Sequence, residues 1–445
     1  MASSEPSTST QKPFNVAIIG GGIAGLTLAI SLLQHSIPLI LYESAPRFGE
    51  IGAGVAFGPN AATAMELISP KIKEAFDRCK TVNPSERCLD SWFSVRVGDA
   101  RKADKEGFVR RAGSGGVKVG EILFEHTFQS SWSRGGVHRA HFLDEMVKLV
   151  PEDVSRFGKK LVDFEDAEDG SGDVVLRFAD GTAAQHSAVI GCDGIKSRTR
   201  EILLGKEDPA ARAVFSGKYA YRGLIPMEKA IEILGEEKAK NSQMYFGYHG
   251  HLLTFPIEKG KTMNVVAFNS RETWDDPNWV VRTTKEEMLA DYSSWGPQVL
   301  SIVSAMQKPD IWALFNHPPA PTYFKDRVCL LGDAAHATTP HQGAGAGMCI
   351  EDAYILSNLM KEASVVEDLH KVFEAYDQVR RPRTQRLVET SKEAGMLYDF
   401  ELEGDDLDKV EANMLERMRW IWDVDLPGEL EKAVRVYRNG VKAKL

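Results

Sequence analysis

The sequence lacks the features that mark secreted, membrane-spanning and nucleic-acid-binding proteins. Its 445 residues include only 5 cysteines, an odd number, and no two are spaced as Cys-x-x-Cys. This argues against a disulfide framework or a zinc site, and we predict no metal site. No apolar run reaches the roughly 18 residues that a transmembrane helix needs. The net charge of −9 argues against a nucleic acid or an anionic membrane as partner.

The chain ends carry two weak signals. Residues 1–12 are polar, lack the apolar core of a signal peptide and are expected to form a disordered tail. Together with unpaired thiols, this favours an intracellular, cytoplasmic protein. The last three residues, Ala443-Lys444-Leu445, are close to the Ser-Lys-Leu peroxisomal address, so a peroxisomal location stays open.

What is present begins with a glycine turn between two apolar runs. Residues 16–19 are apolar, Gly20-x-Gly22-x-x-Gly25 follows, and a helical periodicity then leads to a second apolar run ending before Glu43. Strand, glycine turn, helix, strand and acidic residue form a Rossmann-like dinucleotide-binding unit. The helix N-terminus offers amide groups to a pyrophosphate, and Glu43 can accept hydrogen bonds from a ribose. By itself the unit leaves the choice between FAD and NAD(P) open.

A second copy of this unit is absent, which indicates a single resident dinucleotide. Two further glycine-bearing loops, 52–58 and 343–347, indicate an extended ligand that is contacted along its length, as FAD would be. Arg380-Arg381-Pro382-Arg383, a basic cluster, is expected at the solvated end of a helix.

Three motifs in order then resemble the single-component FAD-dependent aromatic hydroxylases, which have the p-hydroxybenzoate hydroxylase fold. They are Gly20 to Gly25, Asp193-Gly194-x-x-Ser197-x-x-Arg200, and Gly332-Asp333-Ala334-Ala335-His336. Within that family the chain looks most like the salicylate hydroxylases, through segments such as 50–60, 221–223, 243–245, 251–256, 264–268 and 340–347. The resemblance implies an oxidoreductase of aromatic compound catabolism, a flavoprotein monooxygenase with resident FAD and with NADH or NADPH as transient co-substrate.

The resemblance also implies a set of cofactor contacts and an α/β architecture. The expected cofactor-binding residues are Gly20, Gly22, Ala24, Gly25, Glu43, Ala56, Arg139, Asp333, Gly345 and Ala346. The expected fold is a Rossmann-like FAD-binding domain with an inserted antiparallel β-sheet substrate domain and a helical C-terminal part. We place the FAD-binding domain at 13–80, 135–200 and 320–385, the substrate domain at 81–134 and 201–319, and the helical segment at 386–445.

Several elements are expected within these domains. Strands are predicted at 88–97, 219–224, 243–248, 251–256 and 263–268, and helices at 61–67, 137–150, 348–361 and 369–383. The C-terminal helices could be a lid or the surface of a homodimer, and the sequence does not choose between these.

The expected reaction determines the expected substrate residues. A flavin C4a-hydroperoxide attacks electron-rich rings, so a proton-accepting residue is expected near the phenol. By resemblance His341 is that residue; the alternative is a histidine that only packs its loop. A benzoate-type substrate also needs a cation for its carboxylate. Arg271 is the predicted clamp, and Arg222 is the competing arginine, with a catalytic or a purely structural role.

The predicted activity is the decarboxylative hydroxylation of salicylate to catechol with NADH and O2. The residues expected to line the ring pocket are Met244, Tyr245, Phe246, Tyr248, Phe255 and Phe268; the alternative is that half of them face the other side of the sheet as core. One alternative is hydroxylation or dearomatisation of another phenolic acid or of a fungal polyketide, although dearomatising relatives tend to carry tyrosine where this chain has Phe255. The remaining alternative is a flavin-binding protein without catalysis.

Overall fold

The computed structural model of the chain describes residues 12–49, 54–101, 117–128, 134–307 and 310–442. The predicted N-terminal tail up to residue 11, most of the predicted excursion at 99–119 and the Ala443-Lys444-Leu445 terminus lie outside these residues. Within the described part, no helix combines the length and the apolar character needed to cross a membrane.

A six-stranded sheet carries the predicted dinucleotide unit. Its order is β18-β19-β11-β1-β2-β7, with parallel pairing except at β18. Its central strand β1 is wholly apolar and buried, as expected for a strand covered on both faces. The strands are β1 (Val16–Ile19), β2 (Leu39–Tyr42), β7 (Ser155–Arg156), β11 (Ala188–Gly191), β18 (Phe324–Lys325) and β19 (Val328–Leu330).

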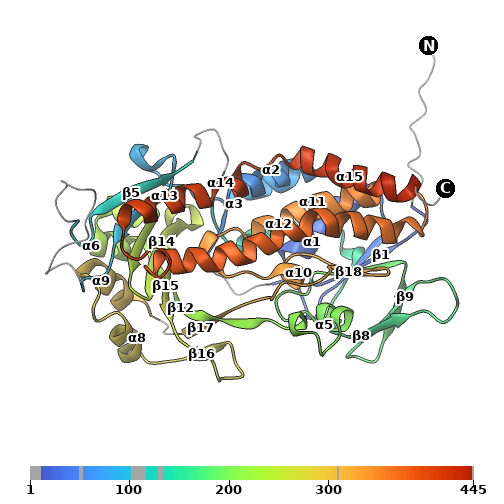
Figure 1. The fold of residues 1–445 in the computed structure, drawn as a ribbon, viewed down its shortest axis with the longest axis horizontal. Helices are drawn as coiled ribbons and strands as arrows, with labels where there is room; N and C mark the ends of the chain where they lie inside the picture. The colour runs from blue at the N-terminus through green and yellow to red at the C-terminus, as the bar shows by residue number, and fades with distance from the viewer. Residues whose placement is uncertain (1–11, 50–53, 102–116, 129–133, 308–309, 443–445) are drawn as a thin grey trace, which may run out of the picture.

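An eight-stranded sheet, mostly antiparallel, forms the second unit, toward the left in Figure 1. Its order is β16-β17-β12-β15-β14-β13-β4-β5, and only β13 and β4 pair in parallel among its strands. The strands are β4 (Ser91–Val97), β5 (Ile122–Thr127), β12 (Val214–Pro226), β13 (Gln243–Gly247), β14 (Gly250–Ile257), β15 (Thr262–Ser270), β16 (Val280–Arg282) and β17 (Asp310–Asn316).

Two small sheets complete the β structure. The three-stranded one contains β8 (Leu161–Asp166), β9 (Val174–Phe178) and β10 (Ala183–His186). The two-stranded one pairs β3 (Gly54–Phe57) with β6 (Gly135–His138), and β6 contacts β14 of the eight-stranded sheet. The mixed α/β architecture predicted from the sequence is confirmed.

The helices cover the large sheets and join them. They are α1 (Ile23–Gln34), α2 (Pro59–Ile68), α3 (Pro70–Cys79), α4 (Arg139–Val147), α5 (Arg198–Leu204), α6 (Met227–Leu234), α7 (Glu236–Lys240), α8 (Lys285–Asp291), α9 (Pro297–Ala305), α10 (Asp333–His336), α11 (Gly345–Glu362), α12 (Asp368–Tyr398), α13 (Leu407–Arg417), α14 (Arg419–Trp422) and α15 (Leu426–Lys442).

The two faces of the eight-stranded sheet pack against different helices. Residues that pair across neighbouring strands share a face, so the register separates the side chains into two sets. One set, including Tyr219, Tyr221 and Tyr245, packs against α6, α8 and α9. The other set, including Phe246 and Phe255, packs toward the C-terminal part of α12 and α13.

Helix α12 connects the two units along the long axis of the molecule (Figure 1). Its 31 residues continue past Arg383, where the sequence predicted an end, and past the predicted domain boundary at 385/386. Pro382 does not stop it, because the arginines on either side are anchored to α11. Arg380 forms ion pairs with Glu351 and Asp352, and Arg383 with Glu351.

The expectation that this basic cluster is solvated was therefore wrong for Arg380 and Arg383. Burial alone would raise the pKa of Glu351 and Asp352, but the facing cations outweigh it and hold the pKa of both carboxyls below its usual range. The cations are Arg383 and Arg380 for Glu351, and His336 and Arg380 for Asp352. The arginine side chains thus neutralise two carboxylates in the core.

Three predicted boundaries also shift. The strand expected from Cys88 begins at Ser91, because Glu86–Cys88 forms a short 3-10 turn. The helix expected from Val137 begins at Arg139, because the backbone of Val137 pairs with Val55 of β3. Strand β12 is longer than predicted. A bulge between Phe215 and Tyr219 allows its residues 214–221 to pair with β17.

We predict that Arg380→Met lowers the free energy of unfolding by about 3–5 kcal/mol, because it leaves two buried carboxylates without their shared cation. Urea unfolding of the FAD-saturated protein measures this. The control is Arg438→Met, which removes an exposed ion pair with Glu362 and is expected to cost less than about 1 kcal/mol. Equal losses for the two variants would show that the buried cluster does not hold α11 to α12.

Candidate active site

The turn after β1 can be built only with glycine at two positions. Gly20 has φ +104°, and a Cβ there would lie 2.4 Å from the carbonyl oxygen of Cys192. A Cβ on Gly25 would lie 1.9 Å from the carbonyl oxygen of Gly20, so helix α1 can approach the strand only at a glycine. Gly22 caps α1 without a side-chain hydrogen bond, so no side chain caps the amides of its first turn.

A cavity of about 520 Å³ opens at this turn. It brings together segments that are far apart in the sequence: residues 19–24, 42–44, 54–55, 139, 159–161, 192–194, 196, 198, 222, 333, 340, 346 and 349. Most of the predicted cofactor-binding residues line it, namely Gly20, Gly22, Ala24, Glu43, Arg139, Asp333 and Ala346. Gly25 lies behind the turn, and Gly345 is the first residue of α11.

Glu43 already organises the glycine turn. One carboxylate oxygen accepts from the amide of Gly21 at 2.8 Å, and the other accepts from the amide of Ala45 at 2.7 Å and from Ser44 Oγ at 3.1 Å. The carboxylate is thereby fixed at the cavity wall, where it can also accept from a hydroxyl of a bound ligand.

Two arginines give one part of the cavity a positive charge. Arg139 and Arg222 both line it, and burial, followed by the charge of Arg139, lowers the pKa of Arg222 to about 10. Arg222 Nε has no hydrogen-bond partner, and among the described residues no carboxylate forms an ion pair with Arg222. Its guanidinium lies 4.8 Å from the ring centre of Trp312. A buried cation without a counterion is costly, so an anionic ligand would fit here.

The face of the sheet that carries Arg222 also carries the predicted ring-pocket residues. Arg222 pairs with Val266, Met244 with Leu253, and Phe255 with Asn264, so these side chains project from one face. Asn264 Oδ1 accepts from the amide of Gly54, but its Nδ2 has no partner. This face is therefore apolar with a few unpaired polar atoms, which is typical of a site for a small organic molecule.

His341 lies beside this face but not on the cavity wall. Pro340, the preceding residue, lines the cavity. The His341 ring is 4.9 Å from the ring of Phe268, and its Nδ1 is 3.3 Å from His251 Nε2. Burial, followed by the charge of His251, holds the pKa of His341 well below its usual value, so the imidazole is neutral near pH 7. Its Nε2 is buried and has no partner.

The structure does not bring Arg271 to this site. Arg271 is exposed, and its guanidinium lies 5.0 and 5.3 Å from the rings of Tyr219 and Trp274. Tyr219 belongs to the opposite face of the sheet, which packs against the helices. Of the two competing arginines, Arg222 is the one at the cavity.

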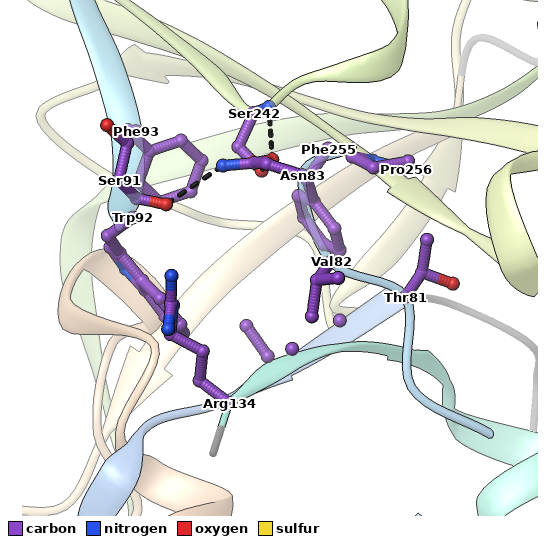
Figure 2. Close-up of a pocket in the computed structure, with 13 residues that line it drawn as sticks. Thr81, Val82, Asn83, Ser91, Trp92, Phe93, Arg134, Ser242, Phe255 and Pro256 are labelled. Atoms are coloured by element: carbon purple, nitrogen blue, oxygen red, sulfur yellow. Dashed lines mark hydrogen bonds between the residues drawn. The ribbon is translucent and has the colours of Figure 1, made fainter. Parts of the chain in front are cut away.

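Ala56 lines a separate, small pocket of about 30 Å³ together with Phe255 (Figure 2). Strands β3 and β6 form one side of it, and Arg134 extends alongside Trp92. Asn83 donates to the carbonyl of Ser91 at 2.8 Å and accepts from the amide of Ser242 at 2.8 Å. These two hydrogen bonds join the start of β4 to the start of β13 at one side of the pocket. Phe255 thus lies between this pocket and Gly54, which lines the large cavity.

Arg200 of the second motif binds backbone, not a ligand. It is fully buried and donates to the carbonyl oxygens of Ala210, Pro318, Ala334 and Ala335 at 2.6 to 3.2 Å. It therefore joins α5 to the segment that carries Asp333. Asp193 accepts from Ser197 and Thr199 and shapes the loop at the cavity edge.

A further group has atoms suited to a metal. One ligand atom each of His138, His141 and Glu258 lies within 4.8 Å of the others. The group sits at the N-terminus of α4, where the helix dipole disfavours a cation, and no motif in the sequence indicated it.

The fit of a flavin dinucleotide rests on these observations. The glycine turn, the start of α1 at Gly22 and Arg222, which has no ion-pair partner in the described part of the chain, all suit an elongated anionic ligand with a polar and an apolar end. Sequence reasoning missed His251, Asp399 and Lys218, which lie behind His341. The two-residue period of β14 could have placed His251 on the face of Phe255, whereas nothing in the sequence pointed to Asp399.

Known proteins resemble this chain in sequence and in structure over nearly its whole length. A family model described as an FAD binding domain matches residues 151–391. The 6-methylsalicylate 1-monooxygenase of Aspergillus terreus is 41% identical over 434 residues, covering 96% of this chain and 93% of that protein. The salicylate hydroxylase of Pseudomonas putida is 37% identical, covering 94% of both. A solved salicylate hydroxylase substrate complex superimposes with a TM-score of 0.81 at 34% identity, covering 95% of this chain and 98% of that one.

We predict that Glu43→Ala weakens FAD binding about ten- to hundredfold, because a charge-assisted hydrogen bond contributes about 1.5–3 kcal/mol. Titration of the apoprotein with FAD, followed by flavin fluorescence, measures the dissociation constant. Glu165→Ala, which removes an exposed carboxylate that pairs with Arg177, is the control and should leave the constant unchanged. Unaltered FAD affinity in Glu43→Ala would contradict the assignment of this carboxylate to the cofactor.

Proposed function

The chain belongs to the family of FAD-dependent monooxygenases of aromatic substrates, and from this premise we propose that it converts salicylate or a close analogue to a catechol. FAD is the resident cofactor and NAD(P)H the family's usual reductant, which sets aside the non-catalytic alternative. In the proposed reaction, salicylate, O2, NADH and two protons give catechol, CO2, NAD+ and water.

The observation that carries the substrate proposal is the unpaired cation on the sheet face. Arg222 has a planar guanidinium that matches a carboxylate, and a substrate carboxylate there would supply its missing counterion. Met244, Leu253 and Val266 on the same face suit a benzene ring. In a ring that carries both groups, the carboxylate would contact Arg222 and the phenol would contact His341.

The chain's own residues would bind the substrate, orient it and accept its proton. When bound, FAD supplies the two-electron chemistry that takes reducing equivalents from NAD(P)H and activates O2. A phenolate is a better nucleophile than a phenol, so removing the phenol proton helps the ring carbon that bears the carboxylate to react. His341 is neutral near pH 7, and its unpartnered Nε2 can accept that proton.

A second candidate substrate is 6-methylsalicylate. It is favoured by the 41% identity to an enzyme that carries this substrate in its name, against 37% for the bacterial salicylate hydroxylase. The same groups would serve, with an extra methyl to accommodate among apolar side chains. Another phenolic acid, or a fungal polyketide hydroxylated without loss of CO2, remains the wider alternative.

We predict that the FAD-loaded enzyme oxidises NADH in the presence of salicylate with one catechol formed for each NADH. Absorbance at the NADH band and chromatography of the product measure both quantities. With 6-methylsalicylate the product is 3-methylcatechol, and the ratio of kcat/KM for the two acids assigns the preferred one. Fast NADH oxidation that yields hydrogen peroxide without catechol, for both acids, would contradict the substrate proposal.

We predict that Arg222→Gln raises the KM for salicylate about ten- to hundredfold, since a hydrogen bond to a charged group contributes about 1.5–3 kcal/mol. The matched control is Arg271→Gln. Arg271 directly follows β15, the strand that pairs with β12, and this variant should leave KM within about twofold. Steady-state NADH oxidation with varied salicylate measures both. The reverse ranking of the two variants would restore Arg271 as the carboxylate clamp.

A further inference from the structure

A continuous line of ionisable side chains runs from His341 to the protein surface. His341 Nδ1 lies 3.3 Å from His251 Nε2, and His251 Nδ1 lies 2.6 Å from Asp399 Oδ1. The other oxygen of Asp399 contacts Lys218 Nζ, which lies 3.0 Å from Glu401 Oε2. Glu401 is exposed and also meets the exposed His249 at 3.0 Å.

The line crosses four separate parts of the fold. His341 lies in the turn before α11, His251 on β14, Asp399 directly after α12, and Lys218 on β12. The side chains of His251 and Asp399 have no exposed surface, and that of Lys218 is 7% exposed. Ionisable groups buried in such number are costly compared with apolar residues of similar size, so packing alone does not account for them.

The contacts fix where the protons lie. A carboxylate opposite a lysine can only accept, so His251 donates its Nδ1–H to Asp399 and presents a lone pair at Nε2. His341 then donates its Nδ1–H to that lone pair, which leaves a lone pair on His341 Nε2. This Nε2 is buried and has no partner, so the inner end of the line is free to receive a proton.

Two packing contacts keep the imidazoles in line. The ring of His251 stacks on Phe268 with centroids 4.2 Å apart and meets Tyr398 edge-on at 5.2 Å. The His341 ring lies against Gly395 of α12, where a Cβ would come within 2.7 Å of Nε2. A side chain at position 395 would therefore displace the imidazole from its place beside His251.

We infer that His251, Asp399, Lys218 and Glu401 form a proton relay that carries the substrate's phenol proton from His341 to solvent. The inference rests on the proposed function, in which His341 accepts that proton. His251, Asp399 and Lys218 are positioning and relay residues, because they act on the substrate only through His341.

The relay transfers one net proton from the phenol to solvent, and no electrons are transferred. The phenol O–H breaks as a new N–H forms at His341 Nε2, and the Nδ1 proton of His341 passes to His251 Nε2. The Nδ1 proton of His251 passes to Asp399, Lys218 gives a proton to Glu401 and takes the one on Asp399, and water removes the proton from Glu401. Return of a proton to the product along the same path restores the starting tautomers.

The charged and titratable groups around the line suit this transfer. His251 faces Asp399, Lys218, Glu401 and His341, and burial, opposed by Asp399, lowers its pKa. His341 faces His251 and Lys218, and these also lower its pKa after burial. Both imidazoles are thus neutral near pH 7, so each can accept a proton in turn.

The test uses FAD-loaded enzyme and a nitro-substituted salicylate, whose phenolate absorbs at longer wavelength than its phenol. Rapid mixing gives the rate of phenolate formation, and titration gives the dissociation constant. We expect Asp399→Asn and His251→Gln to slow phenolate formation at least tenfold while the affinities for the ligand and for FAD stay within about twofold. The matched control is Asp377→Asn, a buried carboxyl within α12, which pairs with Arg381 outside the line and should keep the wild-type rate.

Wild-type rates of phenolate formation in Asp399→Asn and His251→Gln would overturn the relay. If either variant loses FAD, Glu401→Gln decides, because this exposed residue ends the line without supporting the core; a rate lowered at least threefold supports the relay and an unchanged rate overturns it. The proposed function fails separately: the wild-type enzyme would then form neither phenolate with the probe nor catechol from salicylate.

Discussion

Two buried carboxylates on α11 hold the arginines of α12, and the arrangement of the site depends on this pairing. Helix α11 starts at the glycine loop beside the cavity and ends at Glu362, and α12 starts at Asp368 and runs back along α11 to the sheet that carries Arg222. The contacts of Glu351 and Asp352 with Arg380 fix how far one helix slides past the other. They thereby set where Gly395 and Asp399 meet the sheet face, and hence where His341 and His251 lie.

Charge is distributed in a way that suits the proposed reaction. The chain as a whole is acidic, yet the cavity has Arg139 and Arg222 on its wall, with no carboxylate paired to Arg222 among the described residues. Anionic groups of a cofactor and of an aromatic acid would balance these charges. His341, the residue proposed to accept a proton, is kept neutral by burial. Binding and proton acceptance are thus assigned to different side chains on adjoining elements.

Local signals in the sequence were sufficient for the dinucleotide unit. The glycine turn, the apolar strands and Glu43 all fall where the pattern predicted, because each depends on contacts between residues close in sequence or on backbone that only glycine can adopt. The two-residue period of the strands allowed half of the expected pocket residues to face the other side of the sheet, and the structure places Tyr245 there.

The rest of the site depends on contacts between distant segments. Arg380 and Arg383 resembled a solvated cluster, and only their ion pairs with the acidic residues of α11 show that Arg380 is buried and Arg383 partly buried. The sequence analysis favoured Arg271 over Arg222 as the carboxylate clamp, because the sequence does not show the register of β12 and β15, with which Arg222 and not Arg271 reaches the cavity. Asp399 belongs to no motif, and its place follows from the length of α12, which continues to Tyr398 beyond the predicted end at residue 383.

The central claim is that one bound aromatic acid contacts Arg222 and His341 at the same time. A crystal structure of the protein with FAD and salicylate bound tests it most directly. The account predicts the carboxylate within about 3.2 Å of the Arg222 guanidinium and the phenol oxygen within about 3.2 Å of His341 Nε2. A salicylate whose carboxylate meets Arg271, or whose phenol oxygen lies away from His341, would contradict it.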